Sequence, residues 1–220
     1  MASSLQSFGG WLLRMDAEWS GRLALSASAD SPMGGLRPVM KMMEWSMHGV
    51  PWIIANLLLI VFAQSDAALQ FLVNLFLALL FDCVVSGLVK GVVQRRRPAY
   101  NRDDMTAQAP IVDQFSFPSG HSSRAAMLAT IMVGLATSPK GLGLMTGFVV
   151  TAFPPLLAAT RVILGRHFVS DVIAGLLIGW LEGRVVLGLW LSVPLARAAA
   201  APIKAVALFW RSASTDVDEL

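Results

Sequence analysis

The segment from Ala68 to Val93 constrains the fold more than any other feature of the chain. It holds roughly 26 residues, nearly all apolar, and a helix of about 20 apolar residues is long enough to cross a bilayer. Its interior acid, Asp82, is costly in lipid and must face other helices as a structural ion or a hydrogen-bond partner. The segment therefore predicts a membrane span packed against neighbouring spans.

Four further apolar runs predict additional spans, at residues 49–64, 121–137, 142–160 and 168–192. The first reaches a spanning length only if the turn at 45–48 joins it. The chain is 55% hydrophobic and 14% charged, which is too apolar for a soluble domain, and it lacks the alternating segments of about ten residues that build a membrane β-barrel. We expect an all-α fold, a polytopic membrane helix bundle with about five transmembrane helices. Pro154 and Pro155 should kink the fourth span, and residues 138–141 should form a tight return before it.

The two ends of the chain differ from this core. Residues 4–27 place apolar side chains at helical spacing opposite Arg14, Asp16 and Glu18, which predicts an amphipathic helix that lies on the membrane or docks on the bundle. The acids also argue against a cleaved signal peptide. Residues 194–211 are too interrupted for a span and are predicted to be interfacial. The predicted division is an N-terminal amphipathic segment at 1–35, a membrane core at 36–195 and a C-terminal tail at 196–220.

The charged residues and the single cysteine limit the possible functions. The net charge of +3 is modest, but the 17 lysines and arginines are clustered, which suits an anionic substrate or lipid headgroups better than nucleic acid. The lone Cys83 excludes a disulfide framework and a cysteine-based zinc site. Five crossings would bring the end of the second span, the start of the third, the end of the fourth and the start of the fifth to one side. The polar motifs all fall at these four ends, so we expect them to form one site.

The first polar motif is basic. If the second helix continues to the residue before Pro98, Lys90 and Arg97 lie about two turns apart on one face, with Lys90 carried into water. With Arg95 and Arg96 beside them they would form an anion clamp. A basic cluster flanking the membrane is the alternative interpretation.

The second motif is Pro118-Ser119-Gly120-His121, directly before an apolar run. Its backbone N–H groups can crown a helix N-terminus and bind an anion. His121 would then lie beside the anion, where an imidazolium can donate a proton to a leaving oxygen. An ordinary turn and helix cap is about as consistent with this motif taken alone.

The third motif contains Arg161, His167 and Asp171. The last two form an (i, i+4) pair, so the carboxylate can hold one ring nitrogen of His167 and leave the other as a nucleophile. A buried structural ion pair is the alternative. Two of the protein's three histidines fall on the same predicted side as these cations and the Ser-Gly turn, which favours a functional site.

Together the motifs resemble the three-part signature of the type 2 phosphatidic acid phosphatase superfamily. The matching patterns are Lys90-x6-Arg97-Pro98, Pro118-Ser119-Gly120-His121 and Arg161-x5-His167-x3-Asp171. Thr160 stands where the family usually has Ser, and it retains the hydroxyl. Residues 44–52, 95–101 and 115–124 are further similar to the polyisoprenoid diphosphate phosphatases, and this likeness runs from about Leu36 to Trp190.

The resemblance implies a role for each matched residue. Lys90, Arg97 and Arg161, with Ser119 and Gly120, would hold the phosphoryl oxygens. His167 would form a phosphohistidine, oriented by Asp171, and His121 would protonate the leaving oxygen and then activate water. No metal or other cofactor is implied, since three cations supply the positive charge. Arg96, Arg124 and His48 are candidates for a supporting shell, although a capping or interfacial role is also open for His48. Glu182 with Arg184 is interpreted as an interior polar pair.

The resulting hypothesis is an integral membrane lipid phosphatase that hydrolyses isoprenoid diphosphates such as farnesyl, geranylgeranyl or presqualene diphosphate. The alternatives are a phosphatidic acid or sphingoid-base phosphate phosphatase and a catalytically inactive membrane scaffold. The expected partners are the lipid substrate and the bilayer, without nucleic acid, and the sequence leaves the oligomeric state open. Most of the basic residues lie on the motif side, which would make that side cytoplasmic. In a eukaryote, the endoplasmic reticulum or nuclear envelope is expected.

Overall fold

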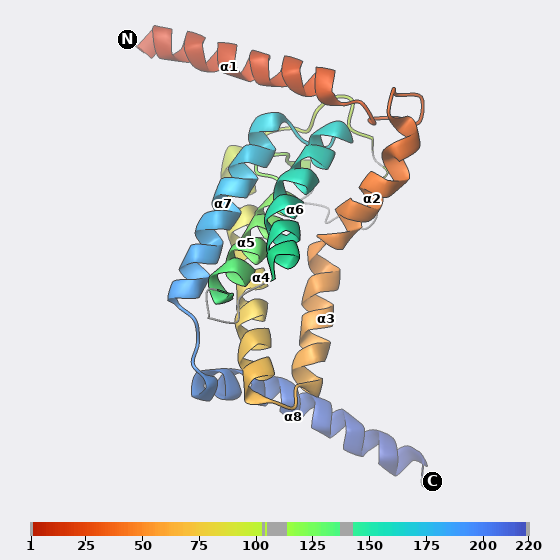
Figure 1. Ribbon diagram of the computed structural model, residues 1–220, viewed down its shortest axis with the longest axis vertical. Helices are drawn as coiled ribbons and strands as arrows, with labels where there is room; N and C mark the ends of the chain where they lie inside the picture. Colours follow the sequence, from red (N-terminus) through yellow and green to blue (C-terminus); the bar gives the residue numbers. More distant parts are fainter. Residues whose placement is uncertain (1, 103, 105–113, 137–142, 219–220) are drawn as a thin grey trace.

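A computed structural model describes residues 2–102, 104, 114–136 and 143–218 (Figure 1). Within these residues there is no β-strand, and Arg96 and Phe115 form an isolated antiparallel bridge. The predicted all-α fold is thus confirmed. The helices are α1 (Ala2–Leu23), η1 (Gly34–Leu36), α2 (Arg37–Ser46), α3 (Gly49–Phe62), α4 (Asp66–Val93), α5 (Gly120–Leu135), α6 (Leu144–Ile163), α7 (Val169–Gly188) and α8 (Val193–Asp218).

The predicted number of five membrane spans is not confirmed. By length and composition, the described residues provide two spanning helices, Asp66–Val93 and Met145–Ile163, and up to four spans if two bent helix pairs each count as one. One pair is η1 and α2 with α3, bent by 45°, and the other is α7 with α8, bent by 107°. α5 has only 16 residues, and its first half is buried by other helices. The tight return predicted at 138–141 lies outside the described residues, while α6 continues through both of its prolines.

Small residues determine how closely α5 and α7 approach. A Cβ at Gly175 would overlap Ser119, the residue before α5, and one at Gly179 or Gly183 would overlap Ser123 or Thr130 of α5. Only glycine therefore permits this contact between the helices. The apolar core continues on the other side of α5, where Met127 and Ile131 pack with Leu79 of α4. The start of α5 is therefore held directly against the start of α7.

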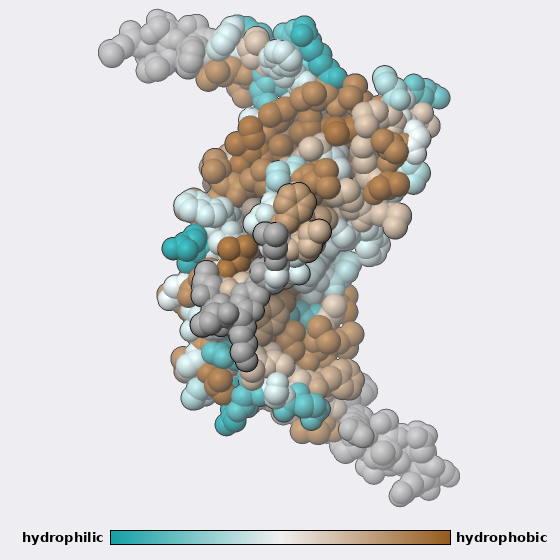
Figure 2. All heavy atoms as spheres, viewed as in Figure 1, coloured by the Kyte–Doolittle hydropathy of each residue, from teal (hydrophilic) through white to brown (hydrophobic). Residues whose placement is uncertain are grey.

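α1 and α8 lie across opposite ends of the bundle (Figure 1). α1 is docked on α7, because Ser20 Oγ accepts a hydrogen bond of 2.9 Å from the Val169 amide, and it exposes Trp11 and Trp19 on another face. α8 is joined to the start of α4 by an ion pair between Arg197 and Asp66. Apolar side chains cover much of the body of the molecule in Figure 2, and hydrophilic ones gather toward its two ends. This pattern fits a protein that crosses a bilayer. The division at 35 and 195 stays a prediction.

Candidate active site

A cavity of about 210 Å³, with charged and polar side chains in its wall, lies where the predicted motifs meet. The end of α4, the start of α5, the turn between α2 and α3, and the loop before α7 all contribute to its wall. Its lining residues are His48, Gly49, Val50, Ile53, Cys83, Ser86, Lys90, Arg97, Gly120, His121, Arg124 and His167. The three motifs, which lie far apart in the sequence, therefore contribute to one site.

A helix-ending turn delivers His167 to this cavity. α6 stops at Ile163, and Gly165, at φ 73°, adopts the left-handed conformation that favours glycine. The amide of Arg166 then donates to the Arg161 carbonyl at 2.9 Å, and the amide of Gly165 to that of Val162 at 2.9 Å. This is the Schellman pattern, which reverses the chain after a helix.

The protonation of His167 follows from its partner. Its Nδ1 lies 2.8 Å from the backbone carbonyl oxygen of Ser116, and a carbonyl can only accept, so Nδ1 carries the hydrogen. Burial lowers the pKa of His167 well below its ordinary value, and the nearby charges of Arg97, Arg161 and Lys90 lower it further. The ring is thus neutral near pH 7 with an electron pair on Nε2.

Asp171 does not make the hydrogen bond to His167 that the (i, i+4) spacing predicted. Its carboxylate lies 3.6 Å from Nδ1, too far for a hydrogen bond, and instead accepts from the Phe168 amide at 2.9 Å and from Arg95 at 2.8 Å. Asp171 is the third residue of α7, where a carboxylate satisfies amide groups that the helix leaves open. It therefore fixes the start of α7, directly after His167.

Arg95, which the sequence placed in the predicted anion clamp, instead supports the start of α7. Besides Asp171, its guanidinium contacts Asp16 of α1 at 2.7 Å and lies 3.8 Å from the ring centroid of Phe168. Arg96, one of the three predicted supporting residues, is exposed. The predicted continuation of α4 was also wrong, because Gln94 ends the helix with a left-handed φ of 48°. Beyond Gln94, Arg95 and Arg97 contact interior groups while Arg96 is exposed, as expected for extended backbone, where alternate side chains point to opposite sides.

The three cations expected to bind phosphate are all near His167. Lys90 is buried to 5% exposure in the cavity wall rather than carried into water. Arg97 reaches the same cavity from beyond the end of α4. Arg161 lies on the last turn of α6, is fully buried, and pairs with Glu44 Oε1 at 2.8 Å.

The residues of the second motif have two different roles, since one caps α5 and two line the cavity. Ser119 caps α5 by accepting from the Ser122 amide at 3.4 Å and from the Ser122 hydroxyl at 2.9 Å, and it does not line the cavity. Gly120 and His121 do line it. The centroid of the His121 ring lies 6.1 Å from that of His48, and its Nε2 has no hydrogen-bond partner in the described part of the chain.

A buried ionic network supports the wall of the cavity at Arg124. Arg124 pairs with Asp82 at 2.6 Å and donates to the Met47 carbonyl at 2.8 Å, which joins α5 to α4 and to the bend before α3. Asp82 is thus the structural ion that its position predicted. Glu182 accepts from Ser123 at 3.0 Å, whereas Arg184 lies exposed on α7, so the predicted interior pair between them is not formed.

This cavity combines an electron pair on a buried imidazole, a second histidine and the cations Lys90 and Arg97, while Arg161 does not line it and lies buried near His167. Such a set can bind a phosphoryl group, neutralise its charge and accept it covalently. Among the described residues, no group of three His, Cys, Asp or Glu side chains is arranged as a metal site.

Comparison with known protein families also groups the three motifs together. The PAP2 superfamily model matches residues 71–193. The chain belongs to the PAP2 superfamily. All three motifs lie inside the matched PAP2 region, whereas Glu44, His48 and Asp16, which contact or line the site, lie outside it.

The curated PAP2 relatives act on different lipids, as their names state. A probable lipid phosphate phosphatase beta of Arabidopsis thaliana is 34% identical over 142 residues, which is 55% of this chain and 66% of that protein. A decaprenylphosphoryl-5-phosphoribose phosphatase of Mycobacterium tuberculosis is 34% identical over 102 residues, 46% of this chain and 51% of that protein. Phosphatidylglycerophosphatase B of Bacillus subtilis is 33% identical over 110 residues, 46% of this chain and 48% of that protein. The matches thus span between about half and two thirds of these relatives.

A solved PAP2 structure shares the fold. It is the transmembrane PAP2 type phosphatidylglycerolphosphate phosphatase of Bacillus subtilis, with a TM-score of 0.58 and 24% identity, over 81% of this chain and 85% of that one. The likeness identifies the helical architecture of a membrane PAP2 protein.

Proposed function

We propose that this protein is an integral membrane phosphatase that releases phosphate from a lipid through a phosphohistidine intermediate. The observation that carries the proposal is the state of His167. Its Nδ1 is bonded to a carbonyl and its pKa is lowered, so a neutral ring with a nucleophilic Nε2 lies among Lys90, Arg97 and Arg161. Membership of the PAP2 superfamily and the names of the relatives support this activity.

The reaction would proceed in two steps. In the first, His167 Nε2 attacks phosphorus, and the bond from phosphorus to the leaving oxygen breaks. That oxygen is the lipid oxygen of a monophosphate or the bridging oxygen of a diphosphate, and His121 gives its proton to it. In the second, His121 takes a proton from water, the resulting hydroxide attacks phosphorus, and the bond to Nε2 breaks to release inorganic phosphate. The three cations would stabilise the charge that gathers on the phosphoryl oxygens in both steps.

An apolar groove beside the cavity supports a lipid as the substrate. The groove has a volume of about 420 Å³ between α3, α4, α5 and α6. Met47 and Ala125 line the groove, and their chain neighbours His48 and Arg124 line the cavity. A phosphate in the cavity would thus have space for its hydrocarbon chain close by, within the bilayer.

Among lipids, we propose isoprenoid diphosphates as the preferred substrates. The sequence likeness to polyisoprenoid diphosphate phosphatases supports this choice, as does a relative named for a polyprenyl lipid. Arg96 and Arg102 are exposed cations that flank Arg97 and the turn around Asn101, where they could meet a second phosphate. A glycerolipid phosphatase is the second candidate, since another relative is named as a phosphatidylglycerophosphatase. We further propose that the side of the membrane with the motifs is cytoplasmic. If the source is eukaryotic, the protein lies in the endoplasmic reticulum or the nuclear envelope.

Phosphate release by purified protein in detergent micelles tests the proposal. Farnesyl diphosphate, presqualene diphosphate and phosphatidic acid are compared at matched mole fractions, with His167→Ala as the inactive control. Release from none of them by the wild-type protein would reject the phosphatase proposal. Equal or faster release from phosphatidic acid would reject only the isoprenoid preference.

A further inference from the structure

Glu44 is a buried acid that no motif of the proposed reaction uses. It lies on α2 with 6% exposure and contacts two arginines, Arg161 at 2.8 Å and Arg166 at 3.5 Å. The charges of Arg161 and Arg166 lie close enough to hold Glu44 in its ionised form despite its burial. Glu44 on α2 precedes the PAP2 match, which begins at residue 71.

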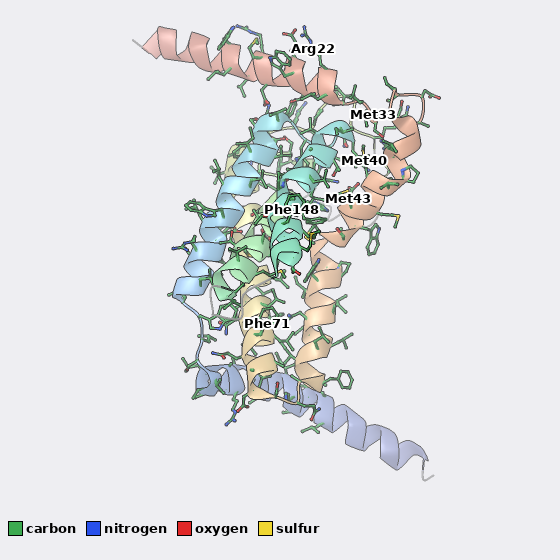
Figure 3. All side chains as sticks on the ribbon, viewed as in Figure 1. Arg22, Met33, Met40, Met43, Phe71 and Phe148 are labelled. Atoms are coloured by element: carbon green, nitrogen blue, oxygen red, sulfur yellow. The ribbon has the colours of Figure 1, made fainter. Side chains whose placement is uncertain are left out.

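The position of Glu44 is fixed by the apolar packing and the ion pairs of its helix, α2. Met40 and Met43 extend from α2 toward α6 (Figure 3), and Met40 is buried there. At the start of α2, Arg37 binds both carboxylate oxygens of Asp104, at 3.0 and 2.9 Å, and Asp104 in turn contacts Arg166 at 2.8 Å. α2 is thus joined to α6 and to the loop before His167, with Glu44 directed at the arginines.

Arg161 is the residue through which Glu44 can influence the reaction. Its charge acts on both His121 and His167, so its guanidinium lies near both groups of the proposed chemistry. A guanidinium is planar and carries five N–H donors, so one carboxylate contact orients it without exhausting its capacity to bind an anion. A fully buried arginine also needs a nearby negative charge before substrate arrives.

We propose that Glu44 is a positioning residue that holds the Arg161 guanidinium in the orientation needed to stabilise the transferring phosphoryl group. The inference rests on the proposed function and adds to it a residue from outside the PAP2-matched region. Positioning matters most in the transition state, so loss of Glu44 lowers kcat more than it raises KM.

The test compares Glu44→Gln with wild type. The amide keeps the size and one hydrogen-bond acceptor but removes the charge. We expect kcat to fall about tenfold with little change in KM. We also expect the affinity for orthovanadate, which can adopt the geometry of the transition state, to fall by a similar factor in isothermal titration. Affinity for inorganic phosphate should change less.

A double-mutant cycle separates positioning from a purely structural role. If Glu44 acts through Arg161, then Arg161→Ala and the double variant Arg161→Ala/Glu44→Gln bind orthovanadate equally weakly. If Glu44 only supports α2, the double variant binds orthovanadate more weakly than Arg161→Ala, by the same factor that Glu44→Gln alone causes. That result overturns the inference. Glu44→Asp serves as a second variant, because it retains the charge and should recover part of the kcat lost in Glu44→Gln.

The control is Glu18→Gln, which removes the same charge from an exposed ion pair with Arg22 on α1 and should leave kcat and KM unchanged. Wild-type kcat and orthovanadate affinity in Glu44→Gln would also overturn the inference. A wild-type protein that releases no phosphate from any lipid tested would instead reject the proposed function itself.

Discussion

The carbonyl oxygen of Ser116 lies 2.8 Å from Nδ1 of His167 and is its hydrogen-bond acceptor. Because a backbone oxygen cannot donate, this contact selects the tautomer with the electron pair on Nε2. The conformation of residues 115–117, next to the cavity, therefore determines which nitrogen of His167 can react.

Replacing His167 by alanine should abolish phosphate release, because no other described group at the site offers an equivalent nucleophile. Phosphate release from the preferred lipid measures this effect. The protein should remain folded, as judged by its elution as a single species in detergent. Activity within tenfold of wild type would contradict the phosphohistidine mechanism.

His121→Ala should be less severe on substrates with good leaving groups. Protonation of the leaving oxygen matters less when that oxygen is already acidic, so a nitrophenyl phosphate should retain more activity than a lipid phosphate. The measurement is the ratio of the rate on the nitrophenyl phosphate to the rate on the lipid phosphate, compared between His121→Ala and the wild-type protein. Equal losses on both substrates would show that His121 is not the general acid.

The lowered pKa of His167 predicts the pH dependence of kcat/KM. A neutral nucleophile persists below the ordinary histidine value of 6.5, so the acidic limb of the profile should have its midpoint below that pH. Arg97→Gln removes the charge that contributes most after burial, so the midpoint should rise. A midpoint above 7 in the wild-type protein would contradict this assignment.

The lowered pKa of His167 also makes the stability of the fold depend on pH. Between the folded pKa and 6.5 the unfolded chain binds more protons than the folded one, so the free energy of unfolding should decrease as the pH falls through that window. Denaturant titrations at several pH values measure the slope. His167→Gln should flatten it, and an unchanged slope would assign the effect to other groups.

The ion pair between Arg124 and Asp82 should be essential for the fold around the cavity. Asp82→Ala leaves a buried guanidinium unpaired, which typically costs about 3–5 kcal/mol. Thermal unfolding in detergent should show a large decrease in Tm. The exposed pair between Arg197 and Asp66 offers a control, because solvent screens it and Asp66→Ala should lower Tm much less.

Much of the site could be predicted from the sequence because its chemistry resides in local motifs at helix ends. Lys90, Gly120, His121 and His167 all line the cavity as expected. The supporting residues were less predictable. The alternation that brings Arg95 rather than Arg96 inward depends on Gln94 ending α4, and a three-arginine run gives no sign of that ending.

The sequence by itself determined the helical membrane class, because long apolar runs have few other ways to satisfy their backbone groups in lipid. It also determined which residues carry the proposed chemistry, since the motifs are short and chemically specific. Only the tertiary structure decided the partners: Ser116 rather than Asp171 for His167, Asp16 for Arg95, and Glu44 for Arg161. Each of these contacts joins segments distant in the chain, and their geometry depends on how the helices pack, which no local pattern encodes.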